Sequence, residues 1–462
     1  MTNQKNKAVS ISAIERLFRP KSVAIIGAST NPAKTSGRPL KFLREYGFSG
    51  KIWPVNPQSS EIEGIRCYAS IDDLPAAPDA SIILLGPAGT EDAIRKLSTL
   101  GASASIVLGG GYSETGPAGI KRQVALSEAA KSMRVLGPNT IGLLNLQDRV
   151  ILSASGALDA GQLTAGKIGV ISQSGGILGS LLSRAAAKGI GLSYLAATGN
   201  EADLETCDIL EWMINETKTS VITLYLEGLR NTKRFNFLAK AASRAGKYLV
   251  VYKVGKSDAG ALASASHTGA MAGDDRLYDA LFAQCGVLRV DRFDDLLDIA
   301  MALSTGKKTR GGRVGILTST GGAGGLVADR CGLVGLTTPV PSRKTAARLS
   351  SLLRHVGFNA NRNPIDLTLA GLTPEIVRGS ITALLEAKEY DIVIPIIGSS
   401  AVGRPELIAE PLIQAANDIS KPLIVYCSPD APDILYRLNS AGIPTYAAPE
   451  TCAEALRILR KG

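Results

Sequence analysis

The hydrophobic residues of this chain gather in short runs that end in glycine or small polar residues. The first run, at 22–29, is followed by an amphipathic helical pattern at 37–48 and a second strand-like run at 51–57. Two further runs, each before another helical segment, lie at 80–86 and 104–111. Short apolar strands that alternate with helices are typical of a parallel sheet covered by helices on both faces. The pattern therefore predicts an α/β fold.

The second half of the chain contains an internal repeat. Residues 166–192 align with 312–336 so that Gly175-Gly176 coincides with Gly321-Gly322, and the later segments 247–255 and 421–429 also correspond. A repeat on this scale indicates two related structural modules. We expect three domains, and the first should close with a single last strand at 135–145. Their predicted bounds are 1–146, 147–309 and 310–462.

Composition narrows the class of protein. The net charge of +10 is spread along the chain, without a basic run interleaved with aromatic residues, so nucleic acid is not an expected partner. The six cysteines lack CxxC spacing, which disfavours a zinc site or a disulfide framework, and no metal ligands are predicted. The start of the chain is polar and no apolar stretch approaches 18 residues. We expect a cytoplasmic protein that does not bind membranes.

The repeated unit has the form strand, Ser/Thr-x-Ser/Thr-Gly-Gly, helix. Small residues let the backbone turn sharply and direct free N–H groups outward, and the positive helix end favours anions. Ser and Thr at such turns also serve as plain helix N-caps, so both explanations stay open. As phosphate-binding candidates the two turns contribute Ser172, Gln173, Ser174, Gly175, Gly176, Ser319, Thr320, Gly321 and Gly322.

The loop at 27–37 of the first domain also suits a phosphate-bearing ligand. It follows a strand and offers Ser29 and Lys34 as donors, although any doubly wound domain needs small residues at this turn. It lacks the G-x-G-x-x-G fingerprint, because Ser29 and Asn31 stand where glycines are expected. This lack argues against a nicotinamide-dependent enzyme.

One of only two histidines lies in the pliable segment SASHTGAMAG (264–273). This segment follows a predicted strand, at the sheet edge where parallel sheets bind ligands, and the matching loop of the other module has no histidine. A neutral imidazole facing an anion site can attack phosphorus, and a carboxylate can steady the ring. Glu227 ends an apolar strand of the same module, and the matching strand of the second module lacks an acid. We therefore expect His267 and Glu227 to be catalytic, whereas His355 is expected to be structural.

These motifs together resemble the alpha subunit of ADP-forming acyl-CoA synthetases, relatives of succinyl-CoA synthetase. The resemblance covers nearly the whole chain and includes SASHTGAMAG, YLEG, SQSGG, TSTGG, GPN (137–139) and GNEAD (199–203). It implies a Rossmann-like CoA-binding domain followed by two flavodoxin-like doubly wound modules. It also implies that His267 is phosphorylated, that Glu227 orients it, and that the two Gly-Gly turns hold the phosphate.

The resemblance further implies the reaction acyl-CoA + phosphate + ADP ⇌ carboxylic acid + CoA + ATP. By resemblance, the residues that line the path of CoA are Gly27, Ala28, Ser29, Lys34, Pro54, Asn56 and Pro57.

One departure from the family concerns the nucleotide site. Single-chain members also contain an ATP-grasp module, which we do not find before the chain ends at Gly462. We expect a separate ATP-grasp beta subunit that carries ATP or ADP and Mg²⁺, and hence a hetero-oligomer. Action without ATP, or a regulatory acyl-CoA-binding protein that is never phosphorylated, are the alternatives. The sequence does not identify the acid, the nucleotide base or the number of subunits.

Overall fold

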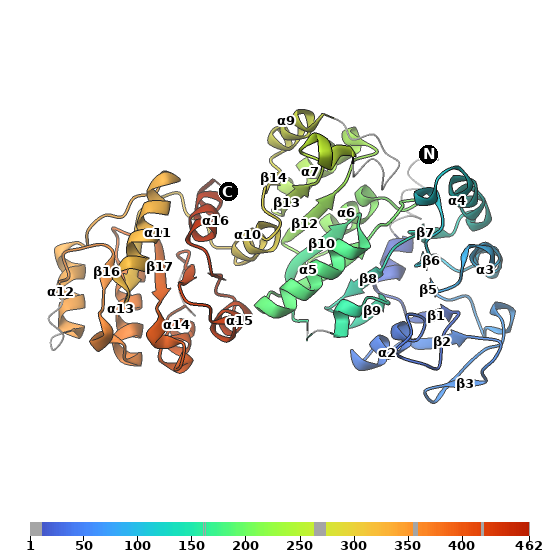
Figure 1. Ribbon diagram of the computed structural model, residues 1–462, viewed down its shortest axis with the longest axis horizontal. Coiled ribbons are helices and arrows are strands. Elements are labelled where there is room, and N and C mark those ends of the chain that lie inside the picture. Colours follow the sequence, from blue (N-terminus) through green and yellow to red (C-terminus); the bar gives the residue numbers. More distant parts are fainter. Residues whose placement is uncertain are drawn as a thin grey trace. The chain divides into compact units, whose positions relative to one another are not determined.

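The computed structural model describes residues 12–159, 161, 163–262, 274–353, 359–416 and 420–461. They form two compact units. Unit 1 comprises Met1–Ala186 and Gly191–Leu296, and unit 2 comprises Ala187–Ile190 and Leu297–Gly462. Figure 1 traces the chain by colour from blue to red.

The first sheet of unit 1 has five parallel strands in the order β2-β1-β5-β6-β7. Their bounds are β1 Ser22–Ile26, β2 Lys51–Val55, β5 Ala80–Ile83, β6 Ala104–Val107 and β7 Arg134–Leu136. Helix α2 (Arg38–Glu45) packs in the core of one face, and α3 (Pro87–Leu100) and α4 (Pro117–Ala130) pack in that of the other. The alternation within β1 explains this, since successive side chains point to opposite faces. A short hairpin, β3 Glu61–Ile62 and β4 Ile65–Arg66, follows β2.

The second sheet of unit 1 has seven strands in the order β14-β13-β12-β10-β11-β8-β9. Its strands are β8 Gly142–Asn145, β9 Val150–Ser153, β10 Ala165–Ser172, β11 Leu192–Ala197, β12 Val221–Leu226, β13 Tyr248–Lys253 and β14 Leu288–Arg289. Its helices are α5 Gly175–Lys188, α6 Thr206–Asn215, α7 Thr232–Arg244 and α9 Asp275–Cys285. Strand β8 pairs antiparallel with both β9 and β11, and the remaining neighbouring strands pair parallel.

The expectation of one last strand at 135–145 is wrong. This segment forms two strands in two sheets: β7 ends at Leu136, and β8 begins at Gly142 beside β11. The backbone leaves the first sheet at Gly137, whose φ is +99°, and Pro138 has no N–H to continue a ladder. The Gly-Pro pair therefore separates two apolar runs that the hydrophobic pattern alone joins.

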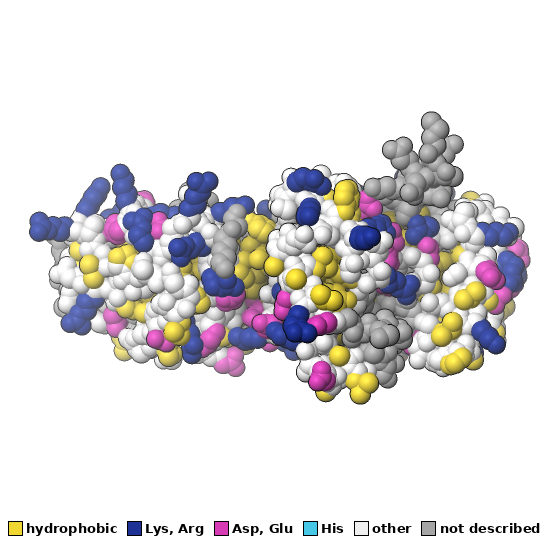
Figure 2. Space-filling view, turned by 90° about the horizontal axis from the view of Figure 1, so that it is seen from above, with side chains coloured by type: hydrophobic (Ala, Val, Ile, Leu, Met, Phe, Trp, Pro, Cys, Tyr) yellow, Lys and Arg dark blue, Asp and Glu magenta, His cyan; other side chains and the backbone are white. Residues whose placement is uncertain are grey.

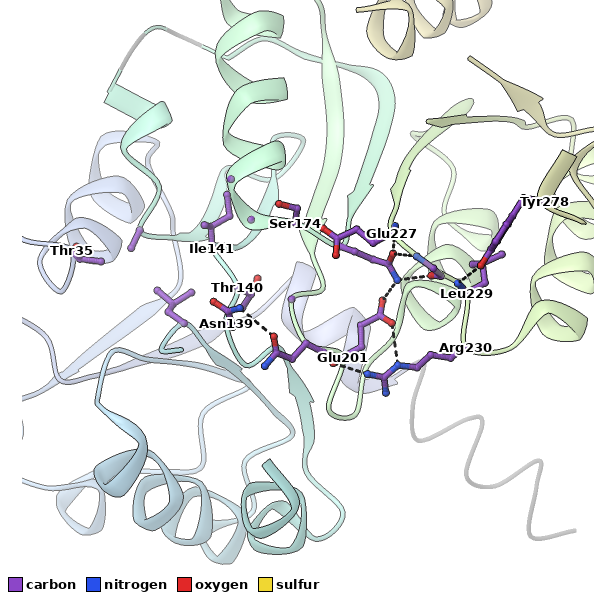
Figure 3. Close-up of a pocket in the computed structure, with 18 residues that line it drawn as sticks. Thr35, Asn139, Thr140, Ile141, Ser174, Glu201, Glu227, Leu229, Arg230 and Tyr278 are labelled. Atoms are coloured by element: carbon purple, nitrogen blue, oxygen red, sulfur yellow. Dashed lines mark hydrogen bonds and ion pairs between the residues drawn. The ribbon is translucent and has the colours of Figure 1, made fainter. Parts of the chain in front are cut away.

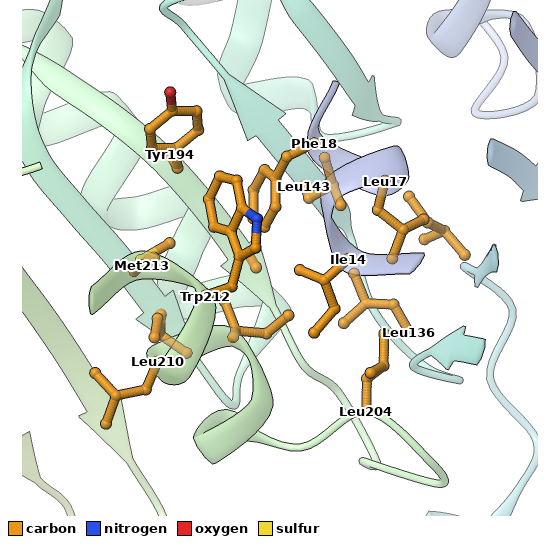
Figure 4. Close-up of a cluster of buried hydrophobic side chains, with 14 of the residues drawn as sticks. Ile14, Leu17, Phe18, Leu136, Leu143, Tyr194, Leu204, Leu210, Trp212 and Met213 are labelled. Atoms are coloured by element: carbon orange, nitrogen blue, oxygen red, sulfur yellow. The ribbon is translucent and has the colours of Figure 1, made fainter. Parts of the chain in front are cut away.

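A single hydrophobic core connects the two sheets of unit 1. The helical residues 12–18 bring Phe18 against the ring of Trp212 with centroids 4.3 Å apart, and Phe18 meets the edge of Tyr194 at 5.6 Å. Figure 4 shows these rings together with Leu136 and Leu143. Aromatic packing of this kind buries large areas. It therefore holds the two sheets together as one unit.

Unit 2 contains a five-stranded parallel sheet in the order β16-β15-β17-β18-β19. The strands are β15 Val314–Thr318, β16 Ile365–Asp366, β17 Ile392–Ile397, β18 Val425–Cys427 and β19 Thr445–Tyr446. The helices from the end of unit 1 onward are α10 Asp295–Ser304, α11 Gly321–Leu333, α12 Arg343–Leu352, α13 Pro374–Glu386, α14 Ala409–Ala416, α15 Pro432–Ser440 and α16 Pro449–Lys461. The order matches β11-β10-β12-β13-β14 of unit 1 position by position. The repeat found in the sequence is therefore a repeat of topology.

The surface shows no single dominant charge on the face seen in Figure 2, where basic side chains stand among acidic and neutral ones. All six cysteines are buried free thiols. Of the helices in the described ranges, none combines the length and apolar character needed to cross a bilayer.

Candidate active site

A cavity of about 590 Å³ opens in unit 1 where the carboxyl ends of β10 and β12 meet loops of the first sheet. Thr35 lies at one side of this cavity and Tyr278 at the other, with Glu227 between them (Figure 3). Parallel sheets bind ligands at this edge.

The turn between β10 and α5 is held in shape by Ser172. This residue is fully buried, and its hydroxyl donates to Ser174 O at 2.7 Å and accepts from Ser174 N at 3.2 Å. Ser174 Oγ in turn accepts from Ile177 N at 3.4 Å, so it caps α5. Ser174 lines the cavity, whereas Ser172 acts within the turn.

The amino end of α5 faces the cavity through Gly175 and Gly176. A Cβ at Gly175 would lie 2.9 Å from Ile141 Cγ2, which explains the need for glycine there. The first N–H groups of a helix have no acceptor within it, and the dipole adds positive potential. This end of the cavity is therefore suited to an anion.

Gln173 also lines the cavity, but its amide bonds to the protein. Oε1 accepts from the backbone N–H groups of Glu227 at 2.6 Å and Gly228 at 3.0 Å. Nε2 donates to Gly228 O at 2.8 Å and to Glu201 Oε1 at 3.3 Å. The turn of α5 and the end of β12 are thus connected.

Glu227 directly follows β12 and is half-buried in the cavity wall. His267 and His355 lie outside the described residues. On the neighbouring strand, Lys253 is 4% exposed and its Nζ lies 4.6 Å from the centroid of the Tyr278 ring. Burial lowers the pKa of Lys253, although Asp275 and Glu227 oppose this shift.

Sequence reasoning gave no role to a polar cluster on the same cavity wall. Glu201 is 4% exposed, and its Oε1 accepts from Thr198 Oγ1 at 2.9 Å, from Thr206 N at 2.9 Å and from Thr206 Oγ1 at 2.7 Å. Its Oε2 lies 3.6 Å from Nε of Arg230. The GNEAD motif contains Glu201, but no pattern distinguished Arg230, an exposed residue after a strand.

Asn200 extends this cluster toward the first sheet. It accepts from Asn139 Nδ2 at 3.2 Å and donates to Glu114. Burial opposes ionisation of Glu114, but the hydrogen bonds from Asn200 and Gly111 N outweigh burial and lower its pKa. The GPN and GNEAD motifs therefore meet in the structure.

The turn between β15 and α11 in unit 2 repeats the first turn. Thr318 is buried, and its hydroxyl accepts from Thr320 N at 2.9 Å and donates to Thr320 O at 3.0 Å. Gly321 and Gly322 begin α11, and a Cβ at Gly321 would lie 3.4 Å from Asp366 Oδ2. Ser319 lines a small, mostly apolar cavity of about 20 Å³.

The predicted CoA residues gather at the carboxyl ends of β1 and β2. Gly27 has φ +83°, and the N–H groups of Gly27 and Ala28 donate to Val55 O at 3.0 and 3.2 Å. Asn56 Nδ2 donates to Ala28 O at 2.7 Å and so ties the two strand ends together. Ser29 is half-buried in the same loop, Pro54 is buried in β2, and Lys34 and Pro57 are exposed.

Comparison with known proteins places the chain in a family. Residues 21–145 match the model of a CoA binding domain, and 165–303 match that of a succinyl-CoA ligase like flavodoxin domain. The alpha subunit of ADP-forming acetate–CoA ligase I of Pyrococcus furiosus is 34% identical over 461 residues, 97% of each chain. The chain belongs to the family of ADP-forming acid–CoA ligase alpha subunits.

Two further members of this family extend the comparison. ADP-forming acetate–CoA ligase I of Archaeoglobus fulgidus is 32% identical over 96% of this chain, which spans 63% of that longer relative. The solved dinucleotide-forming acetyl-coenzyme A synthetase 1 of Candidatus Korarchaeum cryptofilum, in complex with phosphate and ADP, has a TM-score of 0.85 at 30% identity and 96% coverage of both chains. The resemblance, fold class and enzyme class expected from the sequence are confirmed.

Proposed function

We propose that this chain acts as the alpha subunit of an ADP-forming acyl-CoA synthetase, in the reaction acyl-CoA + phosphate + ADP ⇌ carboxylic acid + CoA + ATP. The observation that carries the proposal is that the amino end of α5 and Glu227 line one cavity. The alternative of a regulatory acyl-CoA-binding protein is not favoured, since the relatives that match over the whole chain are named as ligases.

In the ligase direction, Nε2 or Nδ1 of His267 attacks the γ-phosphorus of ATP and ADP leaves. A carboxylate oxygen of the acid then attacks this phosphorus, the N–P bond breaks, and an acyl phosphate forms. The CoA thiolate attacks the acyl carbonyl and expels phosphate, which leaves the acyl-CoA.

The amino end of α5 would stabilise the transferring phosphoryl group by aligned N–H dipoles, and residues 319–322 of unit 2 would form a second phosphate-binding turn of the same kind. Glu227 would orient the imidazole and balance its positive charge.

The three predicted segments receive roles in this proposal. Residues 1–146 would bind CoA through Gly27, Ala28, Ser29, Lys34, Pro54, Asn56 and Pro57, which the fold brings to one sheet edge. Residues 147–309 would carry the phosphohistidine, and 310–462 the second phosphate-binding turn. Thr35, from the same loop as Lys34, lines the main cavity and supports a path for CoA toward α5.

The proposal includes a partner. Two relatives are named as alpha subunits, and others that the chain matches are about half as long again. We infer an ATP-grasp beta subunit that holds ATP or ADP with Mg²⁺, and a hetero-oligomeric enzyme. The acid would be a small carboxylic acid such as acetate, and the location cytoplasmic, where acyl-CoA and ADP are available.

The test is to mix the purified chain with acetyl-CoA and ³²P-labelled phosphate and to look for acid-labile, base-stable label. This half-reaction needs no nucleotide. We expect label on the native chain and on His355→Ala, and none on His267→Ala. Calorimetry should give the same CoA affinity for all three. Label on His267→Ala, or loss of CoA binding with it, would overturn the proposal.

A further inference from the structure

The side-chain amide of Gln173 uses its full capacity for hydrogen bonds inside the protein. An amide has two acceptor lone pairs on oxygen and two N–H donors on nitrogen. Here the oxygen accepts from Glu227 N and Gly228 N, and the nitrogen donates to Gly228 O and Glu201 Oε1. The Gln173 side chain therefore has no polar hydrogen left for a bound phosphate, and its backbone N–H donates to Tyr225 O at 3.2 Å, although its place in the first Gly-Gly turn predicts a phosphate contact.

The bonds to Glu227 and Gly228 fix the direction of the Glu227 side chain. The N–H of Glu227 lies in the peptide plane before its Cα, and the N–H of Gly228 lies in the plane after it. Because one oxygen accepts from both groups, it fixes the two planes relative to each other. The two planes determine where the Cα–Cβ bond of Glu227 points. The Glu227 side chain starts in that direction, and the residue is half-buried in the cavity wall.

Glu201 determines which way the Gln173 amide faces. A carboxylate can only accept here, so it requires the nitrogen of Gln173 on its side and leaves the oxygen to face residues 227–228. Glu201 is itself held by the Thr198 hydroxyl and by the N–H and hydroxyl of Thr206. It also adopts a φ of +53°, which is uncommon for a residue with a side chain. The surrounding bonds thus hold the carboxylate in place despite this conformation.

We propose that Gln173, oriented by Glu201, is a positioning residue that directs the carboxyl group of Glu227 into the cavity. This inference rests on the proposed function, in which Glu227 orients the phosphorylated imidazole. The second module supports the assignment, because Ser319 takes the place of Gln173 there and Gly398 takes the place of Glu227. Where there is no carboxylate to direct, there is no amide to direct it.

The decisive variant is Gln173→Glu, which keeps the shape and the acceptor oxygens but removes the N–H donors. The new carboxylate would face Gly228 O and Glu201, two acceptors, at neutral pH. We expect phosphorylation by acetyl-CoA and phosphate to slow by roughly 10²-fold, the usual effect of a misplaced catalytic group. The phosphate concentration at half-saturation should stay within about twofold of the native value, because Gln173 does not bind phosphate.

A pH series separates positioning from general damage. The negative charges of Glu201 and Glu227 raise the pKa of the new carboxyl group, while Arg230 opposes them from the far side of Glu201. Below that pKa the group regains one O–H donor and resembles the amide. The rate of Gln173→Glu divided by the native rate at the same pH should therefore rise as the pH falls. A flat ratio, or a phosphate half-saturation raised tenfold at unchanged maximal rate, would overturn the inference.

Two further chains complete the experiment. Gln147→Glu is the matched control, since Gln147 is an amide of the same unit that donates to Gly166 O at 2.8 Å, outside the cavity. It should label like the native chain. Gln173→Met, of similar size and uncharged, should raise hydrogen exchange at the amides of residues 227–228 by about tenfold or more. Unchanged exchange at these amides would overturn the inference. This test does not depend on the labelling reaction, so its result can be told apart from a failure of the proposed function, in which no chain would be labelled.

Discussion

The turns at 172–176 and 318–322 share one framework but lie in different surroundings. In each, a buried hydroxyl at the strand end closes on the residue two positions later, and a Gly-Gly pair then opens a helix. The first turn faces a cavity of about 590 Å³, whereas Ser319 of the second lines one of about 20 Å³. The framework thus provides a positive helix end in both modules, and the residues that follow the neighbouring strands determine which groups surround that end.

The neighbouring strands differ most at the position after the third repeated strand. Glu227 follows β12, and Gly398 follows β17. A Cβ at Gly398 would lie 2.2 Å from Thr320 Oγ1, so the second module in its present form has no room for a side chain there. The turn is therefore the scaffold that the two modules share, and the carboxylate that the proposed function needs lies outside the turn and in one module only.

Removal of the added carboxylate should have the largest effect. Glu227→Gln keeps the size of the side chain but loses the charge that, in the proposed function, balances a phosphorylated imidazole. We expect labelling by acetyl-CoA and phosphate to slow by roughly 10²-fold or more, as when an orienting carboxylate is lost elsewhere. Glu128→Gln, an exposed acid on α4, is the control and should label normally. A near-native rate for Glu227→Gln would remove this residue from the mechanism.

What the two turns share can be tested with a matched pair. Ser172→Ala and Thr318→Val each remove the hydroxyl that accepts from the N–H two residues on. A buried donor left without its acceptor costs about 1–3 kcal/mol. Hydrogen exchange should rise about tenfold or more at Ser174 in one variant and at Thr320 in the other.

The control for this pair is Ser220→Ala. The Ser220 hydroxyl is buried and finds no hydrogen-bond partner within the described part of the chain, so its loss should leave exchange unchanged. A rise in only one of the two turn variants would contradict a common framework.

The acid near the second turn gives a smaller effect. Asp366 ends β16, and its carboxylate lies near Gly321 at the start of α11. It therefore competes with any phosphate held there. Asp366→Asn should lower the phosphate concentration at half-saturation roughly threefold to tenfold, since two like unit charges about 4 Å apart in water repel each other by about 1 kcal/mol. Asp433→Asn, an exposed acid in the first turn of α15, should change nothing. No effect of Asp366→Asn would indicate that the second turn holds no phosphate.

Much of the fold follows from local patterns. The strands at 22–26, 51–55, 80–83 and 104–107 lie inside the predicted runs, because buried parallel strands are nearly continuous in apolar residues. The repeat predicts two related modules, and the strand orders of the two modules match. The prediction of one strand at 135–145 was wrong, because a Gly-Pro pair changes the path of the chain without changing its hydrophobicity.

The cavity residues that the sequence predicted are those of the repeated turn, such as Ser174 and Gly175, and Glu227, which departs from its counterpart. Glu227 could be predicted as a candidate because an acid at the end of an apolar strand has little structural reason to be there. The sequence pattern predicts a phosphate contact for Gln173 but not its bonds to residues 227–228, which lie more than 50 residues away and are linked to it by no local pattern. Glu201 and Arg230 come together by tertiary folding from two loops, which a one-dimensional pattern does not show.

The smallest predicted effect concerns the matched strands β13 and β18, where Lys253 corresponds to Cys427. Burial lowers the pKa of Lys253 below 10.5. At a pH between this lowered pKa and 10.5, the unfolded chain holds a proton that the folded chain has lost, so stability rises with pH. Burial raises the pKa of Cys427 from 9.0 to about 11, with Asp430 adding to the shift. Between these values the unfolded chain has lost a proton that the folded chain keeps, and stability falls with pH.

Two variants measure these opposite contributions by differential scanning calorimetry in steps from pH 7 to 11. As the pH rises toward 10.5, the stability of Lys253→Met should fall relative to that of the native chain. The native chain gains stability because its buried cation loses its charge, and the variant has no such cation. Cys427→Ala should gain relative to the native chain between about pH 9 and 11, because it has no thiol to ionise on unfolding. Parallel curves for both variants would mean that neither group titrates differently on folding, and slopes of the same sign would contradict the assigned surroundings of one of them.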